Sequence, residues 1–304
     1  MGIPTRFLFG GVLMRKKRIS VVALLFVLPV IAILLAISIF PLIYSFYLSL
    51  CQWDIGTGAS RTFIGARNYL RLFTDARLWG ALRNTGLELL LGVGSQFLLG
   101  LALALLLNRP FRGRNLVVTL FLLPMMISPV VVGCIWKIIY HYQYGPLNFL
   151  LERLKLKSVN WLGSNQVSIY SIILADIWEW TPFVMITLLA GLQAIPDELY
   201  EAARVDGATR LGTFFWVVLP LLRPVMIIAI LIRVMDAFKI FDLVALLTMG
   251  GPGQSSETIA FYNYLTGFKY FSMGYASSMA YLQLAIIVII ANVFLKSWKG
   301  REIS

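Results

Sequence analysis

Long apolar segments separated by charged residues and turn formers dominate the chain. The core of a bilayer is about 30 Å thick, so a helix that rises about 1.5 Å per residue crosses it with about 20 apolar residues. Six segments meet this length and predict an all-α integral membrane protein. They cover residues 19–50, 82–107, 116–140, 167–190, 219–247 and 272–295. The stretch 144–165 combines apolar and charged residues, which predicts a short interfacial helix or a simple capping loop.

The composition supports a membrane protein. Of 304 residues, 59% are hydrophobic and 13% are charged, whereas soluble domains carry about a quarter charged residues. A soluble enzyme is therefore excluded. The sequence contains no internal repeat and no long linker, so we expect one membrane domain.

Positive charge predicts the orientation of the segments. The net charge is +12, with a basic run at residues 15–18 and arginines at 109, 112 and 114. Lys and Arg collect in cytoplasmic loops. We therefore expect a basic cytoplasmic N-terminus at residues 1–18, a transmembrane domain at residues 19–298 and a cytoplasmic tail at residues 299–304. The first segment is too long for a cleaved signal peptide, so it is expected to remain as a helix.

The sequence gives little support for metal, redox or histidine-based catalysis. His141 is the single histidine, and Cys51 and Cys134 lack the spacing of metal ligands. The phosphate-binding pattern G-x-x-x-x-G-K-[ST] does not occur. We predict that the chain has no catalytic residue, no metal site and no cofactor of its own. Any ATP hydrolysis would have to take place on a separate subunit.

Several ionisable residues interrupt the apolar segments. Each costs about 2.5 to 3.5 kcal/mol at the centre of a membrane helix, so their side chains should face the protein interior or water. Residues three apart on a helix can pair, which would join Arg233 to Asp236 and Asp236 to Lys239. Direct contact with a solute is the alternative. The set comprises Asp176, Glu179, Arg233, Asp236 and Lys239, with Asp242 one turn later.

The loop between the fourth and fifth segments predicts a short helix. Pro196, Asp197 and Glu198 suit a first helical turn, because the helix dipole favours negative charge there. Gly207 suits the end of the helix. Ala202 and Ala203 provide a face on which another protein could pack closely, although an ordinary surface helix would look similar.

This loop carries a resemblance to a known family. Glu201-Ala202-Ala203, three residues, Gly207, nine residues and then Val217-x-Leu219-Pro220 resemble the EAA signature of permease subunits of ATP-binding-cassette (ABC) importers. Val217 stands where isoleucine is usual. Segments 178–183, 236–242 and 247–252 are similar to the carbohydrate-uptake branch with MalF-like and UgpA-like permeases. The resemblance implies the six-helix fold of a type I ABC importer permease.

The same resemblance implies roles for individual residues. Residues 191–220 would form the coupling loop, whose contacts with the ATPase subunit would be made by Glu201, Ala202, Ala203, Asp206 and Gly207. The positions that contact sugar in the family would correspond here to Glu179, Trp180, Phe183, Arg233, Asp236, Ala237 and Ile240. The charges among them depart from the uncharged polar residues of the best-known maltose permease.

The function predicted from this resemblance is that of a sugar permease. The subunit would import a di- or oligosaccharide across the plasma membrane of a prokaryote, surrounded by lipid and without contact to nucleic acid. Its partners would be a second permease, two ATPase subunits that bind ATP and Mg²⁺, and an extracytoplasmic solute-binding protein.

Other functions stay open on the residues alone. Arg233 and Lys239 could favour an anionic solute such as glycerol phosphate, and a polyol is a further alternative. A stand-alone secondary transporter would explain the intramembrane charges but would predict inverted repeats. A membrane-embedded hydrolase would need a nucleophile with a base, or a metal cluster.

Overall fold

The computed structural model describes residues 21–58 and 60–299, which form parts of two compact units, 1–47 and 48–304. The basic run at residues 15–18, the rest of the predicted N-terminus and residues 300–304 lie outside the described residues. The described part of the first unit is helical throughout. It contains α1 (Val21–Leu34), the π-helical turn η1 (Leu35–Ile39) and most of α2 (Phe40–Ser49). Residues Phe26–Ser49 form the first candidate span.

Near the start of the second unit, two short strands form a small hairpin. Strand β1 (Cys51–Gln52) pairs antiparallel with β2 (Thr62–Phe63) around the 3₁₀ turn η2 (Ile55–Thr57), and α3 (Arg67–Thr74) follows. The hairpin is joined to the start of the last helix, where the Met273 amide donates to the Trp53 carbonyl at 2.9 Å. Residue 274 must be glycine because a Cβ there would overlap the Cys51 carbonyl.

The remaining long helices of the second unit overlap the predicted segments. One continuous span is built from α4 (Ala76–Leu87), the π-helical turn η3 (Glu88–Val93) and α5 (Gly94–Leu107). The others are α9 (Ser168–Gln193), α15 (Met273–Lys299), and α11 (Arg210–Thr213) with η4 (Phe214–Val218) and α12 (Leu219–Ala237). In the described residues, five helices are long and apolar enough to cross a membrane, or six if one bent pair counts as a span.

That bent pair corrects the prediction of one helix over residues 116–140. Helices α6 (Arg114–Met126) and α7 (Pro129–Ile139) meet at an angle of 95°. Ser128 is extended, with φ −61° and ψ 138°. A residue that precedes proline is pushed out of the helical region, and Pro129 is well suited to start a new helix. The proline therefore separates two helices instead of kinking one.

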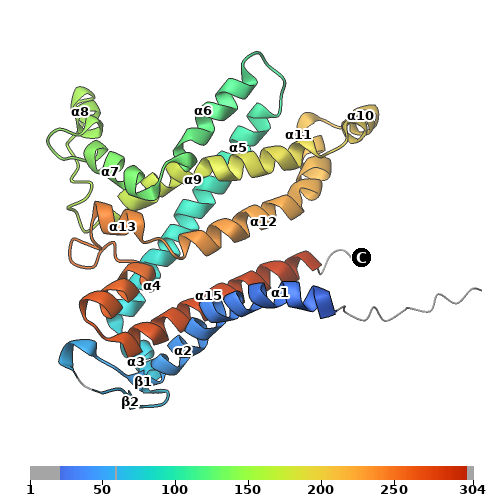
Figure 1. Ribbon diagram of the computed structural model, residues 1–304. Coiled ribbons are helices and arrows are strands. Elements are labelled where there is room, and N and C mark those ends of the chain that lie inside the picture. The colour runs from blue at the N-terminus through green and yellow to red at the C-terminus, as the bar shows by residue number, and fades with distance from the viewer. Residues whose placement is uncertain (1–20, 59, 300–304) are drawn as a thin grey trace, which may run out of the picture. The chain divides into compact units, whose positions relative to one another are not determined.

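The prediction of one helix over residues 219–247 is also wrong. Helix α12 ends at Ala237, and a separate helix α13 (Asp242–Leu247) follows after a short link. Helix α13 lies beside α7 (Figure 1). Its residues Leu243, Val244 and Leu247 are buried in one cluster with Val132 and Trp136 of α7. The apolar side chains indicate that these residues are buried, but they do not show where one helix ends and the chain turns.

Helix α9 lies at the centre of the second unit, alongside α5 and α12 (Figure 1). Glycines allow α9 to pack closely on its neighbours. A Cβ at Gly100 of α5 would lie 2.8 Å from the Val184 side chain of α9, which is too close. At Gly191 of α9 a Cβ would lie 2.8 Å from Leu222 of α12. The backbones therefore approach closely, as small residues allow in membrane helix bundles.

Shorter elements complete the chain. Helix α8 (Pro146–Arg153) confirms the short helix predicted within 144–165, while its place at a membrane interface stays a prediction. The Asn148 side chain joins α8 to the segments before and after it, by hydrogen bonds with Tyr142 on one side and with Val159 and Trp161 on the other. The remaining elements are α10 (Asp197–Val205), α14 (Ile259–Tyr264) and the π-helical turn η5 (Leu265–Lys269).

Candidate functional site

A polar pocket of about 120 Å³ lies between the middle of α9, the end of α12 and the start of α13. It brings together six of the seven residues predicted to contact solute. The remaining one, Phe183, does not line it. The lining residues are Pro129, Asp176, Glu179, Trp180, Arg233, Asp236, Ala237, Lys239, Ile240, Phe241, Asp242 and Leu243.

Arg233 of α12 is the central cation of the pocket and is 1% exposed. Its Nε donates to Gln96 Oε1 of α5 at 2.9 Å, and its Nη2 donates to Asp176 Oδ2 of α9 at 3.0 Å. Gln96 Nε2 in turn donates to the same Asp176 oxygen at 2.6 Å. Three helices are therefore joined by one hydrogen-bonded network.

The expected pairing of Arg233 with Asp236 is wrong. The Asp236 side chain is largely exposed, and it pairs with Lys239 at 3.5 Å, as predicted. Arg233 turns to Asp176 instead because both groups are buried. A buried guanidinium needs a partner that is equally removed from water, since an unpaired buried charge is strongly destabilising.

Two further carboxyl groups are buried without a hydrogen-bond donor among the described residues. Glu179, 1% exposed, has no partner for Oε2, and Glu88 has none for either oxygen. The Glu88 carboxyl lies near that of Asp176. Gly92, one turn along the same helix, leaves the room for it, because a Cβ there would overlap Glu88 Oε1. The buried network thus contains three acidic residues and one arginine.

The ring of Trp180 is held in place by two neighbours. The Arg233 guanidinium covers it at 4.7 Å from the ring centroid, a favourable cation–π distance. Phe183 meets it edge-on, with ring centroids 6.4 Å apart. Phe183 therefore supports Trp180 from outside the pocket rather than lining it.

Sequence reasoning missed Gln96 and Glu88. Both lie on the second span, and they are eight residues apart, which places them on one helix face. A glutamate in an apolar helix is a signal that could have been used, since ionisable residues in spans should face the protein interior. Gln96 carries no charge, so only its hydrogen-bonding capacity pointed to a role.

The predicted short helix is present as α10, between α9 and α11. It ends as expected, because Gly207 adopts the left-handed region with φ +75°. The Ala208 amide donates to the Ala203 carbonyl at 2.9 Å and closes the last turn. Ala203 is buried, whereas Glu201, Ala202, Asp206 and Gly207 are exposed. Four of the five residues predicted to contact an ATPase are therefore accessible in this chain.

A groove of about 720 Å³ runs beside α10. Asn108 and Arg109 at the end of α5 line it together with Asp197, Tyr200 and Arg204 of α10. Burial and the negative charge of Asp197 raise the pKa of Tyr200. The turn after the second span and the loop after the fourth thus lie together, as the predicted topology requires for loops on one side of a membrane.

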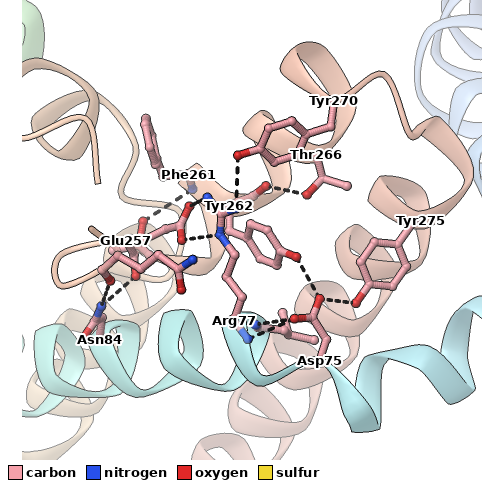
Figure 2. A network of polar contacts seen from close by, with 12 residues as sticks. Asp75, Arg77, Asn84, Glu257, Phe261, Tyr262, Thr266, Tyr270 and Tyr275 are labelled. Atoms are coloured by element: carbon pink, nitrogen blue, oxygen red, sulfur yellow. Dashed lines mark hydrogen bonds and ion pairs between the residues drawn. The ribbon is translucent and has the colours of Figure 1, made fainter. Parts of the chain in front are cut away.

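A second polar network lies at the other end of the α4–α5 span, where α4 begins (Figure 2). We call it the loop clamp, and it consists of Asp75, Arg77, Asn84, Glu257, Tyr262, Tyr270 and Tyr275. Arg77 forms a two-pronged ion pair with Glu257, with both N···O distances at 2.8 Å. Asn84 Nδ2 donates to the Glu257 carbonyl at 2.9 Å, and Arg77 Nη1 donates to the Tyr270 hydroxyl at 3.1 Å.

Asp75 is the acidic residue at the other side of the clamp. It accepts hydrogen bonds from the hydroxyls of Tyr262 at 2.8 Å and Tyr275 at 2.6 Å, and from the amides of Arg77 and Leu78. Burial raises the pKa of Asp75, but these hydrogen bonds together hold it below its usual value. The clamp fixes the loop before α14 against the starts of α4 and α15.

Comparisons with known proteins agree with this architecture. The family described as "Binding-protein-dependent transport system inner membrane component" matches residues 96–300. The trehalose/maltose transport system permease protein MalF of Thermococcus litoralis is 35% identical, over 94% of this chain and 97% of its own. The sulfoquinovosyl glycerol transport system permease protein SmoG of Agrobacterium fabrum is 34% identical, over 92% and 91%.

A solved structure supports the same fold. It is a bacterial ABC transporter involved in the import of the acidic polysaccharide alginate, with a TM-score of 0.81 and 25% identity over 95% of this chain and 98% of the other. The predicted type I importer permease fold is thereby confirmed. The relatives are transport permeases, which also confirms a membrane permease subunit and not an enzyme. The chain belongs to the family of binding-protein-dependent transport system inner membrane components.

Proposed function

We propose that this protein is the permease subunit of an ATP-driven sugar importer in the plasma membrane of a prokaryote. The observation that carries the proposal is the position of α10. It lies between α9 and the continuous span of α11, η4 and α12, and these two spans supply Glu179 and Arg233 to the pocket. A movement of α10 would therefore act directly on the residues that line the solute path.

The pocket chemistry suits a sugar. A hydroxyl can donate to Glu179 Oε2, which lacks a donor among the described residues, and can accept from the Arg233 guanidinium. The face of Trp180 that Arg233 leaves uncovered can stack on the C–H side of a sugar ring. Such a combination of a few polar groups with an apolar wall is typical of small-molecule sites.

The shape of the pocket supports a second permease subunit. The residues of this chain leave the pocket partly open instead of enclosing it on all sides. This chain alone does not enclose a disaccharide. A homologous permease would supply the other wall of the path, and a solute-binding protein would deliver the sugar from the extracytoplasmic side.

Coupling to ATP hydrolysis would run through α10. The exposed Glu201, Ala202 and Asp206 would contact a separate ATPase subunit, which would bind ATP and Mg²⁺. The helix is short and closed at its end by Gly207, so it would transmit a push as a rigid body to both flanking helices. Alternating access by rocking of rigid bundles requires such a connection.

The test is ATPase activity of the reconstituted assembly, with and without binding protein and a panel of disaccharides. We expect sugar and binding protein together to stimulate the wild type. Glu201→Ala should lose this stimulation while the assembly stays intact. Lys157→Ala, which changes an exposed residue outside α10 and outside the pocket, is the matched control and should keep it. Sugar flux through this chain without any ATPase would contradict the proposal.

A further inference from the structure

The acidic residues that line the pocket outnumber the basic residues, and not every acidic residue has a basic partner among the described residues. Four carboxylates line it, from Asp176, Glu179, Asp236 and Asp242, against two cations. Each cation already has a carboxylate partner: Arg233 pairs with Asp176 at 3.0 Å and Lys239 with Asp236 at 3.5 Å. The pocket is therefore lined by more acidic than basic residues.

Neither cation is placed to receive an anionic solute. Two Arg233 nitrogens are engaged by Gln96 and Asp176, and its flat face lies on Trp180. Its charge is balanced before any solute arrives. The Lys239 side chain is 58% exposed, so water screens its charge and weakens its interactions.

Glu179 is the group left for a solute. It is 1% exposed, it lines the pocket, and its Oε2 has no donor among the described residues. A buried polar atom without a partner is costly, and a solute hydroxyl can remove that cost by donating a hydrogen bond. A phosphate, sulfonate or carboxylate of a solute would instead meet a further negative charge where water is scarce.

Given the proposed function, on which this step rests, we propose that the pocket selects hydroxyl-rich solutes without an anionic group, and that Glu179 enforces this selection. It does so by accepting a hydrogen bond from a solute hydroxyl and by repelling anions. Selection against a competitor by an unfavourable contact is a general route to specificity. The solved alginate importer shares this fold but carries an acidic polysaccharide, so the discrimination must depend on side chains and not on the fold.

The test compares a neutral sugar with its phosphorylated counterpart on the complete importer complex. Binding of radiolabelled trehalose and of trehalose 6-phosphate is measured by equilibrium dialysis without the binding protein, which removes that protein's own selectivity. The variants are Glu179→Gln, which keeps the shape and an acceptor but removes the charge, and Lys239→Gln as a pocket-lining control. ATP-driven uptake of both solutes is measured in parallel.

We expect the wild type to bind trehalose at least about tenfold more tightly than trehalose 6-phosphate, a ratio that corresponds to about 1.4 kcal/mol. Glu179→Gln should reduce this ratio severalfold, and Lys239→Gln should leave it unchanged or increase it. The inference is overturned if the wild type does not prefer trehalose, or if Glu179→Gln leaves the ratio unchanged. ATP-driven uptake of the phosphate alone would overturn only this inference, whereas no ATP-driven uptake of any sugar in the disaccharide panel would also remove the proposed function.

Discussion

Two arginine–carboxylate pairs among the described residues of the second unit differ in how completely their hydrogen bonds are satisfied. In the loop clamp, Arg77 bonds Glu257 through two nitrogens, donates to Tyr270 and packs on the Tyr262 ring. In the pocket, Arg233 bonds Asp176 and Gln96, while Glu179 Oε2 next to them has no donor among the described residues. The loop clamp, whose hydrogen bonds are complete, holds loops in place. The pocket network, with a carboxylate oxygen left without a donor among the described residues, can bind a solute.

Burial differs as well. Arg77 is partly exposed, with 27% of its side chain accessible, whereas Arg233 is almost fully buried. The cost of breaking a pair rises with burial, because the remaining partner is then left without water. The two networks should therefore respond differently to the same substitution, and the predictions below compare them, from the largest expected effect to the smallest.

Removal of the pocket arginine should have the largest effect. Arg233→Met leaves Asp176 and Gln96 without their shared donor in the protein interior, which should cost about 3 to 5 kcal/mol. We expect little assembled complex after purification, measured by size-exclusion chromatography. Arg83→Met, an exposed arginine on the α4–α5 span, is the control and should assemble normally. Equal yields of the two variants would contradict the prediction.

Removal of the clamp arginine should have a smaller effect. Arg77→Met leaves the buried Glu257 carboxylate without its main partner but near water, so we expect a loss of about 1 to 3 kcal/mol, measured as thermal stability in detergent. The assembled fraction should still bind trehalose with the wild-type preference over its phosphate. A changed preference would show that the clamp and the pocket are not separate.

The clamp should also weaken in acid. The pKa of Asp75 is lowered in the folded protein, so its hydrogen bonds stabilise the fold above the unfolded value of 3.8. This contribution is lost as the pH falls through the folded pKa. Asp75→Asn should therefore lower thermal stability at pH 7 and flatten its decline below pH about 4. An unchanged slope in the variant would rule out Asp75 as the titrating group.

The smallest effect on stability is expected at the end of α10. Gly207 has φ +75°, and a side chain there costs about 1 kcal/mol. Gly207→Ala should change the melting temperature slightly and reduce sugar-stimulated ATPase activity more strongly, because the orientation of α10 changes. Gly113→Ala, at φ +82° in the α5–α6 turn, is the matched backbone control. Equal loss of stimulation in both would contradict a specific role for α10.

Much of this arrangement could be predicted from the sequence. The positions of the spans follow from hydropathy, and the two motif segments around Trp180 and Asp236 led to residues that meet in one pocket. The break at Ser128 has a local signal in Pro129, which hydropathy alone does not use. The break after Ala237 could not be predicted, because an apolar run indicates burial without giving the direction of the chain. The partnership of Arg233 with Gln96 and Asp176 depends on the packing of three helices, which no local pattern reports.

The most direct test of the account is a structure of the assembled importer with trehalose bound, determined by cryo-electron microscopy. The account predicts a sugar hydroxyl within hydrogen-bond distance of the Glu179 carboxyl group, with Arg233 still bonded to Asp176, and α10 seated against an ATPase subunit. A sugar bound along the path without contact to any residue of α9 or α12 would contradict it.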